Sequence, residues 1–239
     1  MSFITFNGKS SKDFHLRLEG EIDYLSPARD IEFQKIDGQD GELAIGDGAL
    51  KNVPLSYPFR VEVPTGKKLE QVSSDISNWL KQDAQWHDLV FAGDPDYVYQ
   101  AIFNEEYDLS RIVPFFGKCV LTFRAKPYKF LKTGLTEVAL GASIDNPTKR
   151  IARPKIILRG TGNISLKIGS STWTFKNVDQ GLIVDTLYGQ CTTLDGTRPQ
   201  WSKLTSYPLP GIQPGKNSVL TTGTVSSIRI VPRWEAIVG

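Results

Sequence analysis

The sequence is poor in the residues that build metal centres and disulfide frameworks. Its 239 residues include only two cysteines and two histidines. Cys119 and Cys191 lie far apart, and His15 and His87 have no partner at the spacing of zinc ligands. We therefore expect no metal and no cofactor. Both cysteines are interpreted as small buried apolar residues of a protein made in a reducing cytosol.

Long apolar runs are also missing. No stretch approaches the roughly 20 apolar residues that a membrane helix needs. The first residues, "MSFITFNGKSSKDF", lack the charged start and apolar run of a secretory signal. Hydrophobic residues make up 40% of the chain and charged residues 23%, which is ordinary for a soluble globular protein. The sequence predicts synthesis in the cytoplasm and no membrane segment.

The glycine-containing segments match none of the nucleotide-binding or nucleophile motifs. Residues 160–165, "GTGNIS", precede a predicted strand rather than a helix, so they form neither a nucleophile elbow nor a dinucleotide loop. No Walker loop is present. The acidic, glycine-rich residues 37–47 lack the ligand spacing of a calcium loop and are interpreted as solvated turns. These absences favour a protein that is not an enzyme.

Carboxylate pairs are the remaining route to catalysis, because a β-sandwich can host a glycosidase with acids on facing strands. The acidic candidates are Asp94, Asp96, Glu105, Glu106 and Asp108. The first two flank Pro95 in a predicted turn, and the other three fall in a polar connection. A solvated acidic loop is the favoured interpretation. A glycosidase stays an alternative that needs two carboxylates converging in a groove.

The first half of the chain reads as strands with one helix. Strands are predicted at "FHLRLEG", "YPFRVEV", "DLVF" and "YVYQAIF", and "GKCVLTFRAKPYKFL" is predicted to end at Pro127. In residues 67–82, "KKLEQVSSDISNWLKQ", apolar side chains recur at helical spacing. Thr65 is the expected N-cap. The apolar stripe predicts a helix that covers one face of a sheet.

The second half reads as strands only. Seven short runs separated by glycine-bearing turns indicate a β-sandwich or jelly roll: "PKIILRG", "NISLKIG", "TWTFKNV", "GLIVDTL", "GQCTTL", "SVLTTG" and "SIRIVPRW". A bland stretch from Lys132 to Asn146 precedes them, so we place the domains at residues 1–133 and 134–239. The proline-rich "YPLPGIQPGKN", residues 207–217, is predicted to be a stiffened turn.

Three tryptophans of the second half raise the possibility of sugar binding, because an exposed indole stacks on sugar rings. Trp173 alternates with Phe175 and Trp234 ends a strand, so both are expected in the core. Trp201 follows the loop-like "DGTRPQ" and is the best surface candidate. A carbohydrate-binding protein that recognises host cell-wall sugars through Trp201 therefore stays an alternative.

Charge is divided unequally along the chain. Residues 1–133 hold 16 Lys and Arg against 20 Asp and Glu, whereas the remainder holds 12 against 6. The opposite signs indicate two domains with different surroundings. Neither half has the dense basic cluster of a nucleic-acid-binding protein. Within the first half, turn residues on both sides of "ELAI" predict an extended hairpin or arm from Ile36 to Gly48.

The ordered set of motifs resembles the distal tail proteins of long, non-contractile-tailed bacteriophages that infect Gram-positive hosts. The first domain of that family has an acidic glycine turn, a strand, one helix, a tryptophan, a D-P turn and a strand ending in "PY". Here these are "GQDGELAIG", "YPFRVEV", "LEQVSSDISNWLKQ", Trp86, "AGDPDYVYQAIF" and "CVLTFRAKPYKF". The second domain matches through "ARPKIILRG", "YPLPGIQPGKN" and "SIRIVPRWEA". The resemblance covers nearly the whole chain.

The resemblance implies a mainly β fold, with an N-terminal ring-forming hub domain that contains one helix and a C-terminal galectin-like β-sandwich. It implies a homo-hexameric ring, single or stacked, in the virion at the tail tip or baseplate. The partners that it implies are the major tail tube protein, the tail-associated tip protein and the receptor-binding protein. DNA is expected to pass through the ring without specific binding. The chain has no room for the inserted carbohydrate-binding modules of longer family members.

Two sets of surface residues follow from this resemblance. The flexible arm is a candidate to reach a neighbouring copy, and the interface residues that we predict on it are Asp37, Gln39, Asp40, Glu42 and Leu43. If the acidic first domain lines the channel, its charge would repel DNA. The channel-facing candidates are Asp94, Asp96, Glu105 and Glu106.

Overall fold

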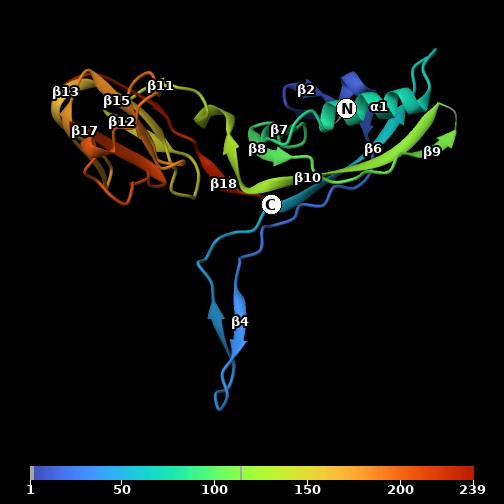
Figure 1. Ribbon diagram of the computed structural model, residues 1–239, viewed down its shortest axis with the longest axis horizontal. Helices are drawn as coiled ribbons and strands as arrows, with labels where there is room; N and C mark the ends of the chain where they lie inside the picture. Colours follow the sequence, from blue (N-terminus) through green and yellow to red (C-terminus); the bar gives the residue numbers. More distant parts are fainter. Residues whose placement is uncertain (1–2, 114) are drawn as a thin grey trace. The chain divides into compact units, whose positions relative to one another are not determined.

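The computed structural model describes residues 3–113 and 115–239. The chain forms two compact units, of which unit 1 comprises Met1–Lys129 with Ile237–Gly239, and unit 2 comprises Phe130–Ala236 (Figure 1). The division thus falls just before the boundary proposed after residue 133. The last three residues belong to unit 1, where Val238 is 2% exposed and lies in the core. No helix in the described ranges is long and apolar enough to cross a membrane.

Unit 1 is built on a nine-stranded sheet with the order β2-β1-β7-β8-β10-β6-β3, to which β9 and β18 add by pairing with β10. The strands are β1 (Ile4–Phe6), β2 (Lys9–Ser10), β3 (Leu16–Leu18), β6 (Val53–Glu62), β7 (His87–Phe91), β8 (Tyr97–Ile102), β9 (Ser110–Val113), β10 (Phe116–Leu131) and β18 (Glu235–Ile237). Strands β6 and β10 pair from Phe116 opposite Glu62 to Ala125 opposite Val53. Side chains along β6 alternate between the core and the opposite face, as the sequence pattern predicted.

Helix α1 (Leu69–Leu80) covers one face of this sheet (Figure 1). The buried side chains of the helix confirm the predicted apolar stripe and are those of Leu69, Val72, Ile76, Trp79 and Leu80. The N-cap is Lys68 rather than Thr65, so that prediction is wrong. Thr65 lies inside a turn closed by the Lys67 N–H donating to the Pro64 carbonyl at 3.1 Å. The Gln71 side chain instead accepts from the Lys68 N–H at 2.9 Å.

Two predicted strand limits of unit 1 are also wrong. Residues Ser11–Phe14 form a 3-10 helix, η1, which Ser10 caps at its start. It ends at His15, whose backbone is left-handed with a φ of 59°, and the strand starts only afterwards. The Phe14 ring still reaches the core, where it stacks on Trp79 at 4.5 Å. Strand β10 continues past Pro127, whose carbonyl accepts from the Val238 N–H at 3.0 Å. Proline removes a donor but keeps its acceptor, which is the group used here.

Unit 2 holds a seven-stranded sheet with the order β11-β17-β13-β15-β16, in which β12 also pairs with β17 and β14 with β13. The strands are β11 (Val138–Ala139), β12 (Ser143–Asn146), β13 (Lys155–Ile168), β14 (Ser171–Val178), β15 (Gly181–Asp185), β16 (Gln190–Thr192) and β17 (Gly215–Val231). The first part of β13 pairs with β15 and its last part with β14. The sheet thereby curls around a core of its own.

Four of the seven predicted runs join into two long strands, β13 and β17. The glycines between them are not turns but sites where the register shifts, on both sides of Gly160 to Thr161. A Cβ at Gly160 would lie 2.4 Å from the Thr224 carbonyl oxygen, so the two strands approach too closely for a side chain there. The predicted turns at these positions are therefore wrong, because the chain continues in the same direction through each of them.

The proline-rich segment anchors a loop on the core of unit 2. Ile212 is fully buried, and its backbone exchanges two hydrogen bonds with Ala152, of 2.9 and 2.8 Å. The Asn146 side chain donates to the Arg150 and Ile212 carbonyls at 2.8 and 3.2 Å. Prolines and these contacts restrict the loop in both the unfolded and the folded state. The stiffened turn predicted from the sequence therefore serves to insert one apolar side chain.

Candidate functional site

A two-stranded hairpin projects from unit 1 (Figure 1). Strands β4 (Glu32–Lys35) and β5 (Glu42–Ile45) pair from Glu32 opposite Ile45 to Lys35 opposite Glu42. The Arg29 guanidinium donates to the Gly48 carbonyl at 3.0 Å at its base. We call residues 31–48 the arm. The predicted hairpin is confirmed, but it begins at Glu32 rather than Ile36.

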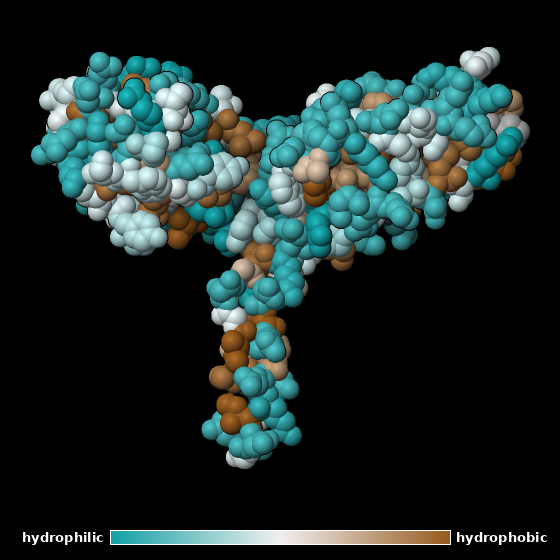
Figure 2. All heavy atoms as spheres, viewed as in Figure 1, coloured by the Kyte–Doolittle hydropathy of each residue, from teal (hydrophilic) through white to brown (hydrophobic). Residues whose placement is uncertain are grey.

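The arm leaves apolar side chains in solvent. Every residue from 32 to 49 is exposed, including Phe33 at 62%, Leu43 at 49% and Ile45 at 46%. Figure 2 shows these apolar groups along the arm. An isolated two-stranded hairpin is at best marginally stable in water, and exposed apolar patches mark interaction sites. The arm is therefore the segment of the described chain that most needs another surface to cover it.

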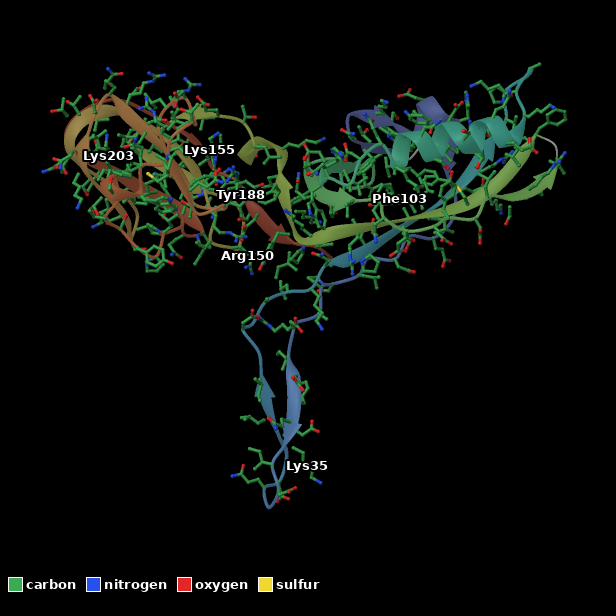
Figure 3. The ribbon with its side chains drawn as sticks, viewed as in Figure 1. Lys35, Phe103, Arg150, Lys155, Tyr188 and Lys203 are labelled. Atoms are coloured by element: carbon green, nitrogen blue, oxygen red, sulfur yellow. The ribbon has the colours of Figure 1, made fainter. Side chains whose placement is uncertain are left out.

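The arm also carries the acidic excess of unit 1. It holds five carboxylates and one lysine, Lys35, which lies on the arm in Figure 3. The carboxylates are those of Glu32, Asp37, Asp40, Glu42 and Asp47. The other residues of unit 1 hold 14 basic against 15 acidic side chains. The charge asymmetry seen in the sequence thus belongs to the arm rather than to the whole first domain.

The five residues predicted as an interface lie together on the arm. Asp37, Gln39 and Asp40 lie in its turn, and Glu42 and Leu43 open β5. Sequence reasoning missed its first strand, above all Phe33. Residues 31–35, "IEFQK", alternate apolar and polar side chains, and this period-2 pattern is the signal that could have identified the strand.

The four acidic channel candidates have different surroundings. The Asp94 carboxylate accepts from the Lys129 ammonium at 2.7 Å and from the Tyr99 hydroxyl at 2.6 Å. Burial, followed by the bond to Asp94, raises the pKa of Tyr99. Asp94 is thus half-buried and its charge is compensated. Asp96, Glu105 and Glu106 are exposed and form no ion pair with described residues.

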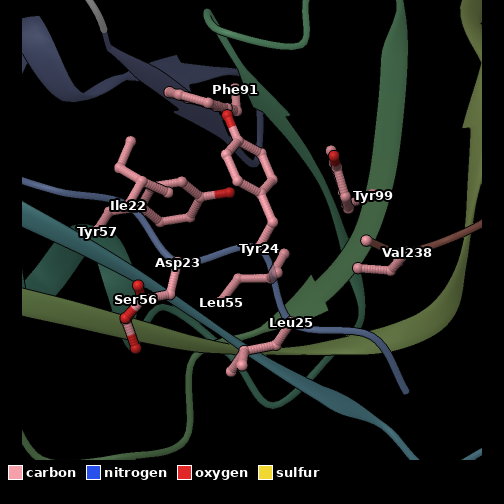
Figure 4. A pocket seen from close by; sticks show the side chains of 11 residues that line it. Ile22, Asp23, Tyr24, Leu25, Leu55, Ser56, Tyr57, Phe91, Tyr99 and Val238 are labelled. Atoms are coloured by element: carbon pink, nitrogen blue, oxygen red, sulfur yellow. The ribbon is translucent and has the colours of Figure 1, made fainter.

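A small apolar pocket lies where the chain leaves the sheet toward the arm (Figure 4). Its volume of about 10 Å³ has room for little more than one water molecule. The side chains of Ile22, Tyr24 and Leu25 meet Tyr57 and Val238 there. The pocket thus lies between the sheet of unit 1 and residues 22–25, which lead toward the arm, and it is too small for a substrate.

The tryptophans of unit 2 are placed as the sequence predicted. Trp173 is fully buried and Trp234 is 6% exposed, whereas Trp201 is 44% exposed in a short 3-10 helix, η3 (Trp201–Lys203). A polar depression of about 370 Å³ lies beside η3. Its lining residues are Asp179, Gln180, Gly181, Thr193, Leu194, Asp195, Arg198, Gln200 and Lys203. Gln200 and Lys203 line this depression, whereas Trp201, which lies between them in the sequence, does not.

Both cysteines are free and buried. Burial raises the pKa of Cys119 to about 12 and that of Cys191 to about 11. Within the described ranges, no three His, Cys, Asp or Glu side chains lie close enough together to hold a metal ion.

We expect both thiols to be inert in the native protein, since the thiolate is the reactive form and is scarce far below the pKa. Ellman's reagent at pH 8 should label neither thiol within minutes, and it should label two per chain after unfolding in guanidinium chloride. Rapid labelling of either cysteine in the folded protein would contradict the burial of that side chain.

No family model and no curated protein sequence matches the chain. Among solved structures, the chain is similar to the crystal structure of SPP1 Dit (gp 19.1), described as a paradigm of the hub adsorption apparatus in phages that infect Gram-positive bacteria. The two share 17% sequence identity, the match covers 96% of this chain and 97% of that one, and the TM-score is 0.74. The chain has the Dit fold.

The shared Dit fold extends over both units, because the match leaves out only a small part of either chain. It confirms the resemblance drawn from the ordered motifs and the mainly β fold with one helix. Identity of 17% is too low for motif spacing alone to establish such a relation. The agreement therefore depends on backbone architecture, to which turns, the helix stripe and strand alternation all contribute.

Proposed function

We propose that the protein is a structural hub of a bacteriophage tail tip, without enzymatic activity. The observation that supports this proposal most strongly is the Dit fold over 96% of the chain, together with an apolar, acidic arm that no described residue outside the arm covers. In this role the protein is part of the virion tail after synthesis in the host cytoplasm. Its partners are the major tail tube protein, the tail-associated tip protein and the receptor-binding protein.

We propose further that unit 1 assembles into a homo-hexameric ring, single or stacked, and that unit 2 is a galectin-like domain attached to it. A closed ring needs two different patches on each protomer, because every copy contacts one neighbour on each side. The arm provides one of these patches. Negative-stain electron microscopy of the purified protein should show annuli with six-fold symmetry. Solitary particles at micromolar concentration would contradict the ring.

The ring leaves a channel through which DNA passes without specific binding. Three exposed carboxylates, Asp96, Glu105 and Glu106, are the groups that we assign to its lining, and they repel the phosphate backbone. Asp94 is not among them because Lys129 neutralises it. Reversing all three to lysine should make assembled rings retain DNA in low-salt filter binding. Unchanged retention would remove these residues from the channel.

A carbohydrate-binding protein is the second candidate function. The exposed Trp201 supports it, together with a polar depression that its sequence neighbours Gln200 and Lys203 line, since sugar sites combine an aromatic platform with hydrogen-bonding groups. Such a protein would bind host cell-wall glycans with a Kd of roughly 1 mM, which corresponds to about 4 kcal/mol. Loss of binding in Trp201→Ala, with the fold unchanged, would favour this function, and failure to bind a panel of cell-wall glycans would exclude it.

A further inference from the structure

The sheet of unit 1 presents a second unpartnered surface, on the side of β10 and β6 opposite the core. Along β10, Cys119, Leu121 and Phe123 point into the core, so the alternate residues point outward. Val120, on that outward side, is 52% exposed. We call this surface the outer face, defined by Pro54, Pro58, Lys118, Val120 and Arg124.

Strand register brings these five side chains together. Val120 lies opposite Pro58, and Arg124 lies opposite Pro54, so each pair shares one side of the sheet. Lys118 is two residues from Val120 and on the same side. Between the two cations of the β10 row lie Val120, opposite Pro58, and Thr122, whose hydroxyl shares a hydrogen bond of 2.9 Å with that of Ser56. The outer face therefore has a small apolar patch at Val120 and Pro58, a satisfied polar pair beside it, and a cation at each end.

The two cations of the outer face are uncompensated. Lys118 lies opposite Arg60, but Arg60 faces Glu19 and Glu62 at 3.8 Å, and Arg17 faces Glu62 at 3.5 Å. Glu19 and Glu62 therefore pair with Arg60 and Arg17 and do not compensate the charge of Lys118. Lys118 and Arg124 are exposed and form no ion pair within the described part of the chain.

One face of the arm has the complementary composition. Leu43 and Ile45 are two residues apart, so they share a face with their cross-strand partners Gln34 and Glu32. This face is apolar along β5 and polar along β4, where it carries the Glu32 carboxylate, and Asp40 lies in the adjoining turn. The arm and the outer face therefore match in apolar character and are opposite in charge.

We infer that the arm of one copy binds the outer face of a neighbouring copy, with Leu43 and Ile45 over Val120, and with the arm carboxylates beside Lys118 and Arg124. Residues 32–48 of the arm are all exposed, so the described sheet of unit 1 does not cover the hairpin. When each copy donates its arm to one neighbour and accepts an arm from the other, the contact is heterologous, which is the type of contact that a closed ring requires. This inference rests on the proposed ring and names its contact.

A charge swap tests the contact. The first variant carries Glu32→Lys and Asp40→Lys in the arm, and the second carries Lys118→Glu and Arg124→Glu on the outer face. Each variant places like charges against each other in every self-contact, which should weaken self-association roughly 100-fold. In a 1:1 mixture each contact joins opposite charges again, so rings of alternating variants should form. Light scattering after size exclusion gives the mass in each case.

The control reverses two exposed lysines of unit 1 away from the outer face, Lys9→Glu and Lys81→Glu, and should assemble like the wild type. A wild-type ring that survives in each charge variant alone would overturn this contact while leaving the ring intact. Variants that stay monomeric in the mixture would overturn it as well. A monomeric wild type would contradict both the contact and the proposed ring.

Discussion

Deleting residues 39–44 from the arm is expected to convert the assembled protein into a folded monomer. The deletion removes the second part of the turn and most of β5, including Leu43, so the hairpin can no longer present its apolar face. No residue of the arm belongs to the core of unit 1. The thermal midpoint of the isolated chain should therefore change by no more than a few degrees, which corresponds to less than about 1 kcal/mol.

Multi-angle light scattering and circular dichroism together distinguish the outcomes of this deletion. The matched control is Trp201→Ala, an exposed substitution in unit 2 that should leave assembly unchanged. A deletion variant that keeps its circular dichroism spectrum and still forms the wild-type assembly would show that the arm is not an interface.

Asp94→Ala is expected to destabilise unit 1 by about 2 kcal/mol, since removing one partner of a partly buried ion pair leaves the more deeply buried charge of Lys129 uncompensated. The Lys129 side chain is 11% exposed, and its ammonium donates to Asp94 at 2.7 Å and to the Tyr99 hydroxyl at 3.2 Å. The Tyr99 hydroxyl also loses its acceptor in this variant. Urea denaturation monitored by fluorescence measures the loss as a lower midpoint with an unchanged slope.

Asp96→Ala provides the matched control, because Asp96 lies two residues away in the same turn but is exposed and unpaired in the described structure. Its free energy of unfolding should change by less than about 0.5 kcal/mol. Equal effects of the two substitutions would mean that Asp94 is a solvated loop residue, as the sequence alone suggested, rather than part of the packing of unit 1.

Local patterns predicted most of the elements of the fold. The helix followed from the spacing of its apolar side chains, and strands β6 and β8 followed from alternation and aromatic content. The limits that failed depend on contacts between distant segments. The strand past Pro127 exists because Val238, near the other end of the chain, donates to it. Gly160 adjoins Thr224 in space, and nothing in its neighbouring sequence distinguishes a bulge from a turn.

The candidate site was predictable where it depends on composition and unpredictable where it depends on pairing. Glycines and carboxylates around "ELAI" identified the arm and its charge. The ion pair between Asp94 and Lys129 could not be predicted from the sequence, because Lys129 lies 35 residues away and comes close to Asp94 only through the order of the strands in the sheet. The outer face could not be predicted for the same reason, since Val120 and Pro58 become neighbours only through the register of β10 and β6.

The molar mass of the purified wild-type protein in solution tests the central claim most directly. Size exclusion with multi-angle light scattering, at micromolar concentration and moderate salt, should give six chain masses in one peak. A single chain mass under these conditions would contradict the claim that this protein acts through surfaces that it offers to copies of itself.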